Sequence, residues 1–320
     1  MKAVVRDRYG GPEVLELKEV PAPTAGPGEV LVRVRAVSIN DWDWGLLVGD
    51  FVNRMLAGPL RPKFAILGSD IAGVVEAVGS GVEDLEIGDE VFGDLSGRWG
   101  GFAELVAAPR AALALKPAVM SFPQAAALPQ AGALAVQGLI DRGEIRPGQS
   151  ILINGAGGGV GTLGVQIART FGVETTGVDS AAKLDVMRAA GYRHVIDYET
   201  EDFTRNGRRY DLILDVKTNR SPFAYLRALQ PGGTYVTVGG SILRLLQLLV
   251  LSPVIRLASG KRLRIVSLEL NKGLDYLSEL FEAGKLRPVL DDLRPLSELP
   301  AAMKVFGAGR HKGKVVILLP

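Results

Sequence analysis

The chain lacks cysteine altogether and has only two histidines, His194 and His311, among its 320 residues. Without cysteine there is no disulfide and no thiolate to hold a metal, and a reducing compartment is permitted. A zinc site would have to combine carboxylates with two imidazoles that lie far apart in sequence, which is a rare donor set. The composition therefore argues against a metal centre.

The chain also lacks an excess of charge of one sign. Its 37 Lys and Arg residues against 35 Asp and Glu residues give a formal net charge of +2, and no basic stripe is interleaved with aromatic residues. Nucleic acid is therefore not an expected partner. The first ten residues, charged from Lys2 onward, have the pattern of a strand and not of a signal peptide. We predict a cytoplasmic location.

No apolar run is long enough to form a good transmembrane helix. The stretches 117–140 and 147–168 contain prolines or a glycine-rich turn. The most apolar run, 245–255, is bounded by Arg244 and Arg256 and is too short to span a bilayer. We expect no membrane-spanning segment.

What the chain does contain is a glycine-dense turn within residues 151–168, ILINGAGGGVGTLGVQIA. An apolar strand pattern leads into it and an apolar helix pattern follows, so we predict strand, tight turn and helix. Such a turn places backbone N–H groups and the positive end of a helix dipole where a pyrophosphate binds. In the spacing Ala156-x-Gly158-x-x-Gly161, Gly158 lets backbone approach the phosphates and Gly161 lets the helix pack closely on the strand.

An acidic residue supports the same interpretation. Asp179 ends the next strand pattern, ETTGVD, 18 residues after Gly161, close to the spacing of a carboxylate that binds the ribose of a dinucleotide. Taken alone, a glycine turn also fits an α/β protein of another function. The turn and the acid together predict a dinucleotide-binding sheet.

The order of patterns along the chain indicates two domains. Up to about residue 116 the chain consists of short strand patterns separated by Gly and Pro turns, with one short helix predicted over residues 41–48. After Pro117, strands alternate with helices centred near residues 165, 186, 225 and 277, which indicates a parallel sheet covered on both faces. The last strand pattern, 313–320, is assigned back to the first domain.

Several segments, in this order, resemble the medium-chain dehydrogenase/reductase superfamily, and specifically its zinc-independent, quinone-oxidoreductase-like branch. They are GSDIAGVVEAVGSGVEDLEIGDEVFG at 68–93, PQAAALPQAGALAVQGL at 123–139, AGGGVG at 156–161, HVIDYETEDF at 194–203 and HKGKVVI at 311–317. The resemblance implies an α/β protein with a Rossmann-type, doubly wound parallel-sheet domain over 118–288. It also implies a GroES-like, mainly β catalytic domain formed by 1–117 and 289–320.

Departures from the zinc-dependent relatives bear on the reaction. Where those relatives carry the first zinc cysteine this chain has Asn40, and where they carry Gly-His-Glu it has Gly68-Ser69-Asp70. Their structural zinc lobe is missing as well. Without a Lewis acid to polarise an alcoholate, we expect hydride delivery from NAD(P)H to a quinone or an α,β-unsaturated carbonyl. The alternatives are an enoyl-thioester reductase, or a cofactor-binding, membrane-peripheral scaffold with little turnover.

Asn40 and Lys217 are the predicted catalytic residues. The resemblance gives Asn40 the role of orienting the nicotinamide or the substrate carbonyl, whereas capping a helix is the alternative, and the expected role of Asp43. Lys217 follows a strand at the sheet edge where ligands bind, and it would polarise a carbonyl or donate a proton unless it turns outward to solvent. The predicted substrate-pocket residues, of which the two tryptophans would equally serve packing between domains, are Trp42, Trp44 and Gln130.

The phosphate preference of the coenzyme stays open. Asp179 favours NAD because it would repel a 2′-phosphate. Lys183 falls where NADPH-dependent quinone reductases place a phosphate-binding lysine, although a solvated helix lysine is the alternative. The predicted NAD(P)(H) site comprises Asn40, Ala156, Gly158, Gly159, Val160, Gly161, Asp179, Ser180, Lys183, Tyr198, Gly239, Gly240, Ser241, His311 and Lys312.

Two segments of the sequence indicate where a membrane or a second copy of the chain would bind. The apolar segment 242–257, expected to be broken or kinked at Pro253, is a lid, a dimer element or a peripheral membrane contact, and the sequence leaves these alternatives open. The pattern at 264–270 is that of the outermost strand of the coenzyme sheet. Because an exposed edge invites pairing with another chain, we predict a homodimer through 264–270.

Overall fold

The computed structural model describes all 320 residues and divides the chain into two compact units. Unit 1 comprises Met1–Gln130, Leu270–Glu282 and Leu290–Pro320, and unit 2 comprises Ala131–Glu269 and Ala283–Val289. These units differ from the predicted domain boundaries chiefly in two segments, 118–130 and 270–282, which pack with unit 1.

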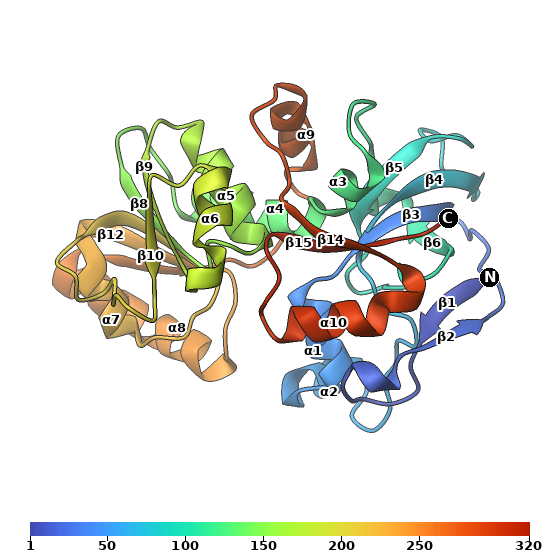
Figure 1. Cartoon of the computed structure of the whole chain (residues 1–320), viewed down its shortest axis with the longest axis horizontal. Coiled ribbons are helices and arrows are strands. Elements are labelled where there is room, and N and C mark those ends of the chain that lie inside the picture. Colours follow the sequence, from blue (N-terminus) through green and yellow to red (C-terminus); the bar gives the residue numbers. More distant parts are fainter. The chain divides into compact units, whose positions relative to one another are not determined.

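Unit 1 is built on a seven-stranded sheet in the order β14-β15-β3-β4-β5-β7, with β6 also paired to β3 (Figure 1). Every pair is antiparallel except β14 with β15, and β1 and β2 form a separate hairpin. The predicted GroES-like, mainly β domain is therefore present. Its elements are β1 (Lys2–Val5), η1 (Pro12–Val14), β2 (Glu16–Glu19), β3 (Glu29–Ser38), α1 (Asp41–Val48), α2 (Phe51–Ala57), β4 (Asp70–Val78), β5 (Glu90–Asp94), β6 (Leu105–Pro109), η2 (Arg110–Ala112), β7 (Ala114–Leu115), α3 (Phe122–Ala126), α9 (Leu274–Glu282), β14 (Leu290–Pro295), η5 (Leu296–Glu298), α10 (Leu299–Gly307) and β15 (Lys314–Leu318).

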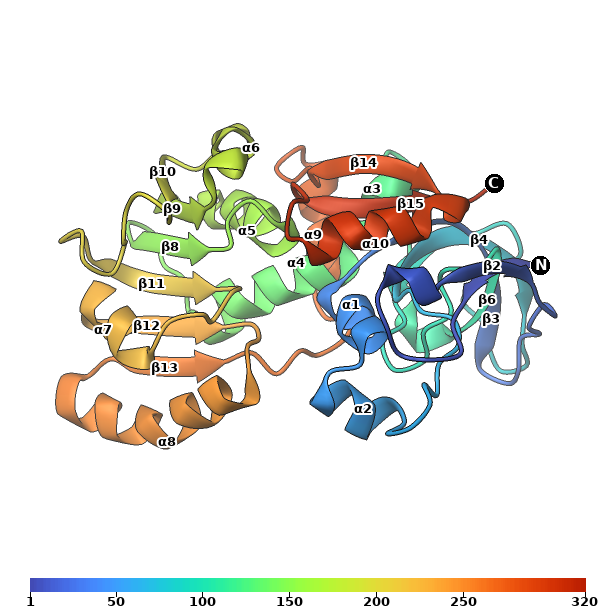
Figure 2. The ribbon, with the colours of Figure 1, turned by 60° about the horizontal axis from the view of Figure 1, so that its bottom comes forward.

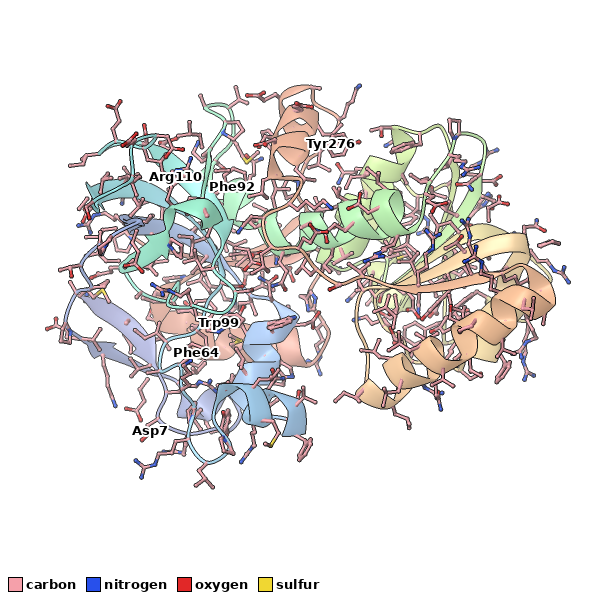
Figure 3. The ribbon with its side chains drawn as sticks, turned by 180° about the vertical axis from the view of Figure 1, so that it is seen from behind. Asp7, Phe64, Phe92, Trp99, Arg110 and Tyr276 are labelled. Atoms are coloured by element: carbon pink, nitrogen blue, oxygen red, sulfur yellow. The ribbon has the colours of Figure 1, made fainter.

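Strand β3 is the centre of this unit. Its valines Val30, Val32 and Val34 are fully buried while the residues between them are partly exposed, as the two-residue period of a strand requires. Three aromatic rings pack together in this unit. Trp99 lies edge-on to Phe64 (Figure 3), and it stacks on Trp42, with ring centroids 6.1 Å apart in both pairs.

Unit 2 contains a six-stranded sheet in the order β10-β9-β8-β11-β12-β13, in which every neighbouring pair is parallel (Figure 2). The strand order reverses between β8 and β11, which is the arrangement of a doubly wound dinucleotide-binding sheet and confirms the predicted Rossmann-type fold. Its elements, with the helix α4 that leads into them, are α4 (Pro129–Val136), η3 (Gln137–Arg142), β8 (Ser150–Asn154), α5 (Gly159–Arg169), β9 (Glu174–Asp179), η4 (Ala181–Lys183), α6 (Leu184–Ala190), β10 (His194–Asp197), β11 (Tyr210–Asp215), α7 (Pro222–Ala228), β12 (Leu229–Thr237), α8 (Ile242–Ser259) and β13 (Arg262–Ile265).

Helix α8 departs from the sequence expectation. A break or a kink was predicted at Pro253, and the helix runs for 18 residues through that proline, so the break does not occur. Proline deprives the Leu249 carbonyl of its helical N–H partner, and both residues are exposed to solvent. By length and composition alone α8 could cross a membrane, with a mean hydropathy of 1.7 and 11% of it buried. The sequence analysis, which considered only residues 245–255, therefore underestimated the length of this apolar helix.

Candidate functional site

The predicted strand, turn and helix are present in unit 2. Strand β8 leads into Gly155, whose φ of +90° lies in the left-handed region that favours glycine, and Gly158 is the N-cap of α5. A Cβ on Gly161 would lie 2.5 Å from backbone atoms of Ala156 and Gly155, so only glycine lets α5 pack this closely on the turn. A Cβ on Gly158 would meet nothing closer than 3.6 Å, which leaves the space beside it open.

The start of α5 is suited to bind an anion. The first turn of a helix leaves its amides without helical partners, and here those amides belong to Gly159, Val160 and Gly161. Unpaired N–H groups and the positive end of the helix dipole together attract a phosphate. The residues of this turn therefore fit the pyrophosphate of a dinucleotide.

Asp179 ties the glycine turn to the end of β9. Its carboxylate accepts the N–H groups of Gly157 and Ser180, both at 2.9 Å, and lies 3.8 Å from the Lys183 ammonium. The two charged side chains are only 7% and 5% exposed. Lys183 is therefore not a solvated helix lysine, and its charge offsets the negative charge of Asp179.

A second buried carboxylate, which the sequence analysis did not single out, orders the neighbouring turn. Asp215, fully buried at the end of β11, accepts hydrogen bonds from Asn154 Nδ2 at 2.8 Å, the Tyr235 hydroxyl at 2.7 Å and the Thr218 N–H at 2.9 Å. Burial raises the pKa of Tyr235 above its ordinary value, and the negative charge of Asp215 raises it further. The Tyr235 hydroxyl therefore keeps its proton and stays a donor. Lys217 lies on the same turn with an exposed side chain.

The other predicted coenzyme residues of unit 2 differ in their surroundings. The turn at Gly239 and Gly240 packs on the Asp215 turn: the Thr218 hydroxyl donates to the Gly239 carbonyl, and a Cβ on Gly240 would lie 2.7 Å from Thr218. Ser241 caps α8. Tyr198 follows β10 and is 48% exposed. The carboxyl ends of β8, β11 and β12 thus gather these turns at the edge where ligands bind in such sheets.

In unit 1, Asn40 precedes α1 and lies in a buried polar cluster. Its Nδ2 donates to Ser69 Oγ at 3.2 Å, and its Oδ1 accepts from Lys314 Nζ. An ammonium only donates, so Lys314 fixes which end of the amide is oxygen and directs Nδ2 towards Ser69. Asn40 is 5% exposed and Ser69 is fully buried.

The cluster continues through Asp70. This fully buried carboxylate lies 3.5 Å from Lys314 Nζ and accepts the Gln130 N–H at 3.2 Å. Burial raises the pKa of Asp70 to about 7, although the Lys314 ammonium acts in the opposite direction. The Gln130 side chain, predicted for the substrate pocket, instead donates to Asp94 at 3.4 Å and Ser96 at 3.3 Å. We call Asn40, Ser69, Asp70 and Lys314 the Asn40 cluster.

Asp43 has the local structural role expected from the sequence. Its two carboxylate oxygens accept the N–H groups of Asn40 and Gly68, each at 2.9 Å. Burial raises the pKa of Asp43 to about 7 as well. Asp43 thereby holds the start of α1 against the segment that carries Ser69.

The remaining predicted residues of unit 1 lie outside the cluster. Trp44 packs so closely on α10 that a Cβ on Gly307 would lie 2.2 Å from its ring, whereas Trp42 is 50% exposed. His311 is buried and stacks on Phe306 with the ring centroids 4.5 Å apart. Lys312 is exposed, and its N–H donates to Asp291 at 2.9 Å.

The donor chemistry of the Asn40 cluster does not fit zinc. Asn40, Ser69 and Asp70 offer neither thiolate nor imidazole, and the Lys314 ammonium lies among them. In the whole chain, no group of three or more His, Cys, Asp or Glu side chains is arranged to hold a metal. Sequence reasoning missed Lys314 in this role, because it follows Asn40 by 274 residues.

Comparison with known proteins identifies the family. The model of the alcohol dehydrogenase GroES-like domain matches residues 26–118, and that of the zinc-binding dehydrogenase matches residues 190–317. An NADPH-dependent alkenal/one oxidoreductase of Arabidopsis thaliana is 32% identical, with 99% of this chain and 79% of that protein covered. The structure of a quinone oxidoreductase from Coxiella burnetii has a TM-score of 0.86 and 30% identity, covering 100% of this chain and 99% of that one. Mycoketide-CoA synthase of Mycobacterium tuberculosis is 32% identical over 96% of this chain, which spans only 7% of its length.

The doubly wound sheet with its glycine turn, together with the GroES-like unit, defines a two-domain dinucleotide-binding protein. The chain belongs to the medium-chain dehydrogenase/reductase superfamily, in its zinc-independent, quinone-oxidoreductase-like branch. The resemblance found in the sequence is thereby confirmed.

Proposed function

We propose that the protein is an NAD(P)H-dependent oxidoreductase that reduces a quinone or an α,β-unsaturated carbonyl compound without a metal. The observation that carries this proposal is the Asn40 cluster, in which Asn40, Ser69 and Asp70 replace residues of the zinc-dependent relatives and lie beside the buried Lys314 ammonium. The similar proteins named as quinone and alkenal/one oxidoreductases support it. When bound, NAD(P)H supplies the hydride.

In this proposal the Asn40 amide acts on the substrate carbonyl. One Nδ2 hydrogen is given to Ser69, and the other is the donor for a carbonyl oxygen that gains negative charge. Lys314 is a positioning residue, because it orients the amide through Oδ1. Without a Lewis acid the acceptor must already be electron-poor, as a quinone or enone is. The exposed side chain of Lys217 does not favour its predicted role as a second donor.

Acceptor-dependent oxidation of NADH and NADPH tests the proposal. We expect turnover with quinones and enones and no oxidation of simple alcohols by NAD⁺ or NADP⁺, and we expect Asn40→Ala to lower kcat with coenzyme binding intact. Preference for an enoyl thioester would favour the alternative reductase activity. Tight coenzyme binding without turnover on any acceptor would contradict the proposal and favour a scaffold.

We infer a preference for NADPH from the surroundings of Asp179. Its carboxylate is already hydrogen-bonded to Gly157 and Ser180 and is paired with the buried Lys183, so its charge is compensated. A 2′-phosphate near this pair would meet an ammonium as well as a carboxylate. The similar alkenal/one oxidoreductase, whose name states NADPH dependence, supports this inference.

Two substitutions test the coenzyme preference. Lys183→Met should lower kcat/KM for NADPH relative to NADH by about tenfold or more, which corresponds to about 1.4 kcal/mol. Asp179→Asn, which removes the negative charge and keeps an acceptor oxygen for one of the two backbone N–H groups, should shift the ratio towards NADPH. Steady-state kinetics with both coenzymes measure the ratio. If neither substitution changes the ratio of kcat/KM for NADPH to that for NADH, another segment selects the nucleotide.

The predicted homodimer through residues 264–270 remains a proposal, which the edge position of β13 supports. The Val266 N–H donates to Thr237 within unit 2 at 2.9 Å, so alternation turns the backbone groups of Ile265 and Ser267 outward. Ser267→Pro should therefore yield monomers, because it removes an outward donor and spares the inner ladder. Analytical ultracentrifugation at micromolar concentration measures this, and a wild-type monomer would refute the dimer. The cytoplasmic location likewise remains a prediction.

A further inference from the structure

Helix α8 exposes an apolar face along its whole length. Seven large aliphatic side chains on it are between 49% and 91% exposed: Ile242, Leu243, Leu246, Leu249, Val250, Val254 and Leu257. At about 100° per residue they fall within a single arc of roughly 140°. A surface helix normally turns polar residues outward, so an apolar face of this extent marks an interaction site.

The opposite face of α8 packs on unit 2. Leu248 and Ile255 belong to the buried core of that unit, and the Ser252 hydroxyl donates to the Leu263 carbonyl of β13 at 2.9 Å. The helix therefore lies along the edge strand, as Figure 2 shows. Crossing a bilayer would require these contacts to break, so the exposed face is suited to lie on a surface and not to span.

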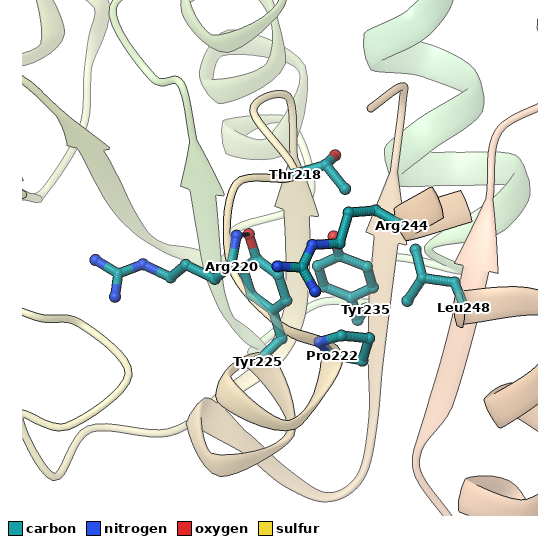
Figure 4. Close-up of a pocket in the computed structure, with 7 residues that line it drawn as sticks. All are labelled: Thr218, Arg220, Pro222, Tyr225, Tyr235, Arg244 and Leu248. Carbon is teal, nitrogen blue, oxygen red and sulfur yellow. Dashed lines mark hydrogen bonds between the residues drawn. The ribbon is translucent and has the colours of Figure 1, made fainter. Parts of the chain in front are cut away.

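The apolar face continues onto α7 through an open groove. The groove has a volume of about 400 Å³ and is lined by Phe223 of α7 and by Leu243, Leu246 and Val250 of α8. Phe223 is itself 58% exposed. Arg244 lines both this groove and a smaller pocket formed with Tyr225 and Tyr235, which Figure 4 shows. The apolar surface thus spans two helices and has room for part of an acyl chain.

The charges within and around this face are positive. Residues 241–268 contain five Lys or Arg residues and no Asp or Glu. Two of them, Arg262 and Arg264, are paired with Glu144, whereas Arg244 and Arg256 form no salt bridge and lie near the two ends of α8. Within this segment, three basic side chains have no carboxylate partner: Arg244, Arg256 and Lys261. Neighbouring segments contribute two more, Arg209 and Arg227.

We propose that unit 2 binds the surface of an anionic lipid bilayer through α8. The apolar arc lies at the boundary between headgroups and acyl chains, and Arg256 and Lys261 contact lipid phosphates, as in amphipathic helices that lie in the membrane plane. A second copy of the chain is a poorer occupant, because it would bring two positively charged rims together. This inference goes beyond the proposed reaction and does not depend on it.

Co-sedimentation of the full-length protein with vesicles tests the proposal. Binding to phosphatidylcholine vesicles that contain one-third phosphatidylglycerol should exceed binding to phosphatidylcholine alone by about tenfold or more, and added salt should weaken it. The double variant Leu246→Gln/Val250→Gln should lower the binding by about tenfold or more. Both side chains are exposed, so the fold does not depend on them.

The matched control replaces two aliphatic side chains of unit 1 whose exposure is comparable to that of Leu246 and Val250. Ile87 and Val119 are each 70% exposed, and Ile87→Gln/Val119→Gln should bind vesicles as the wild type does. Equal losses in both double variants, or no sedimentation with either kind of vesicle, would overturn the proposal. So would a wild-type dimer that Leu246→Gln/Val250→Gln makes monomeric without any vesicle binding, because a second copy would then be the occupant.

Discussion

Replacing Gly158 with valine should weaken the binding of both NADH and NADPH at least about a hundredfold, or about 2.7 kcal/mol, while unit 2 stays folded. The backbone at Gly158, with φ −89° and ψ −177°, suits any residue, and a Cβ there meets no atom within 3.6 Å. The valine methyl groups would extend into the open space beside the start of α5, where we propose that the pyrophosphate binds. Calorimetric titration with each coenzyme measures the loss, and circular dichroism confirms the fold.

Gly161→Ala is the matched comparison within the same turn. Its new methyl group would lie 2.5 Å from backbone atoms of Ala156 and Gly155, so α5 must shift away from the turn. We expect this variant to lose about 1–3 kcal/mol of unfolding free energy. Gly158→Val should show the reverse pattern, with affinity lost and stability kept. Unchanged coenzyme affinity in Gly158→Val would mean that the phosphates bind elsewhere.

Lys314→Met should destabilise unit 1 by about 3–5 kcal/mol at high pH, because it leaves the buried Asp70 carboxylate without its cation. Lys314 Nζ lies 3.5 Å from Asp70 and also donates to Asn40, and both charged side chains are nearly or fully buried. Chemical denaturation measures the loss. The same substitution frees the Asn40 amide to rotate, so kcat with a quinone or enone should fall as well.

The loss of stability in Lys314→Met should grow with pH. Burial raises the pKa of Asp70 to about 7, so the folded protein keeps a proton that the unfolded chain, with a carboxyl pKa of about 4, has released. The stability that protonated Asp70 contributes is thus present at low pH and declines as the pH rises towards 7. Without the ammonium this pKa rises further and the decline continues, so wild type and variant should differ little at about pH 6 and most above about pH 8.

Asp70→Asn provides the control for this pair. An amide carries no charge, so Lys314→Met in that background should lose less stability. Its loss should also depend less on pH, with a remainder from Asp43, whose pKa the Lys314 ammonium also lowers. Two results would contradict the proposed pairing of Asp70 with Lys314. One is a loss of unfolding free energy in Lys314→Met that is the same at low and high pH. The other is an equally large loss when Lys314→Met is made in the Asp70→Asn variant.

The regular parts of the fold could be predicted from the sequence because their signals are local. Helix α1 has the predicted limits, 41–48, since the Asn40–Asp43 pair marks its start. The alternating valines of β3 form one of the short strand patterns predicted before residue 116. Strands β5 and β14 were not predicted. In β14 three of six residues are charged, and the strand forms by pairing with β15, a tertiary contact that no local pattern announces.

The candidate site shows the same division. The glycine turn and Asp179 could be predicted from their spacing in the sequence. Asp179 and Lys183, however, were interpreted as opposing signals for the choice of coenzyme, whereas the structure shows them as one ion pair. Lys314 and Asp215 are the residues that sequence reasoning missed. Lys314 is the first residue of one apolar strand and Asp215 is the last residue of another, which is the available signal. Their partners Asn40 and Tyr235 come from distant segments. Only the tertiary structure shows these hydrogen bonds.

The central claim, that the Asn40 cluster serves a metal-free reduction of an activated acceptor, is tested most directly by one measurement. NADPH oxidation with the best quinone or enone is compared before and after exhaustive dialysis against a chelator, with elemental analysis of the same samples. The account predicts unchanged kcat and kcat/KM and no stoichiometric metal. About one zinc per chain, with activity lost on its removal and regained on its return, would contradict the account.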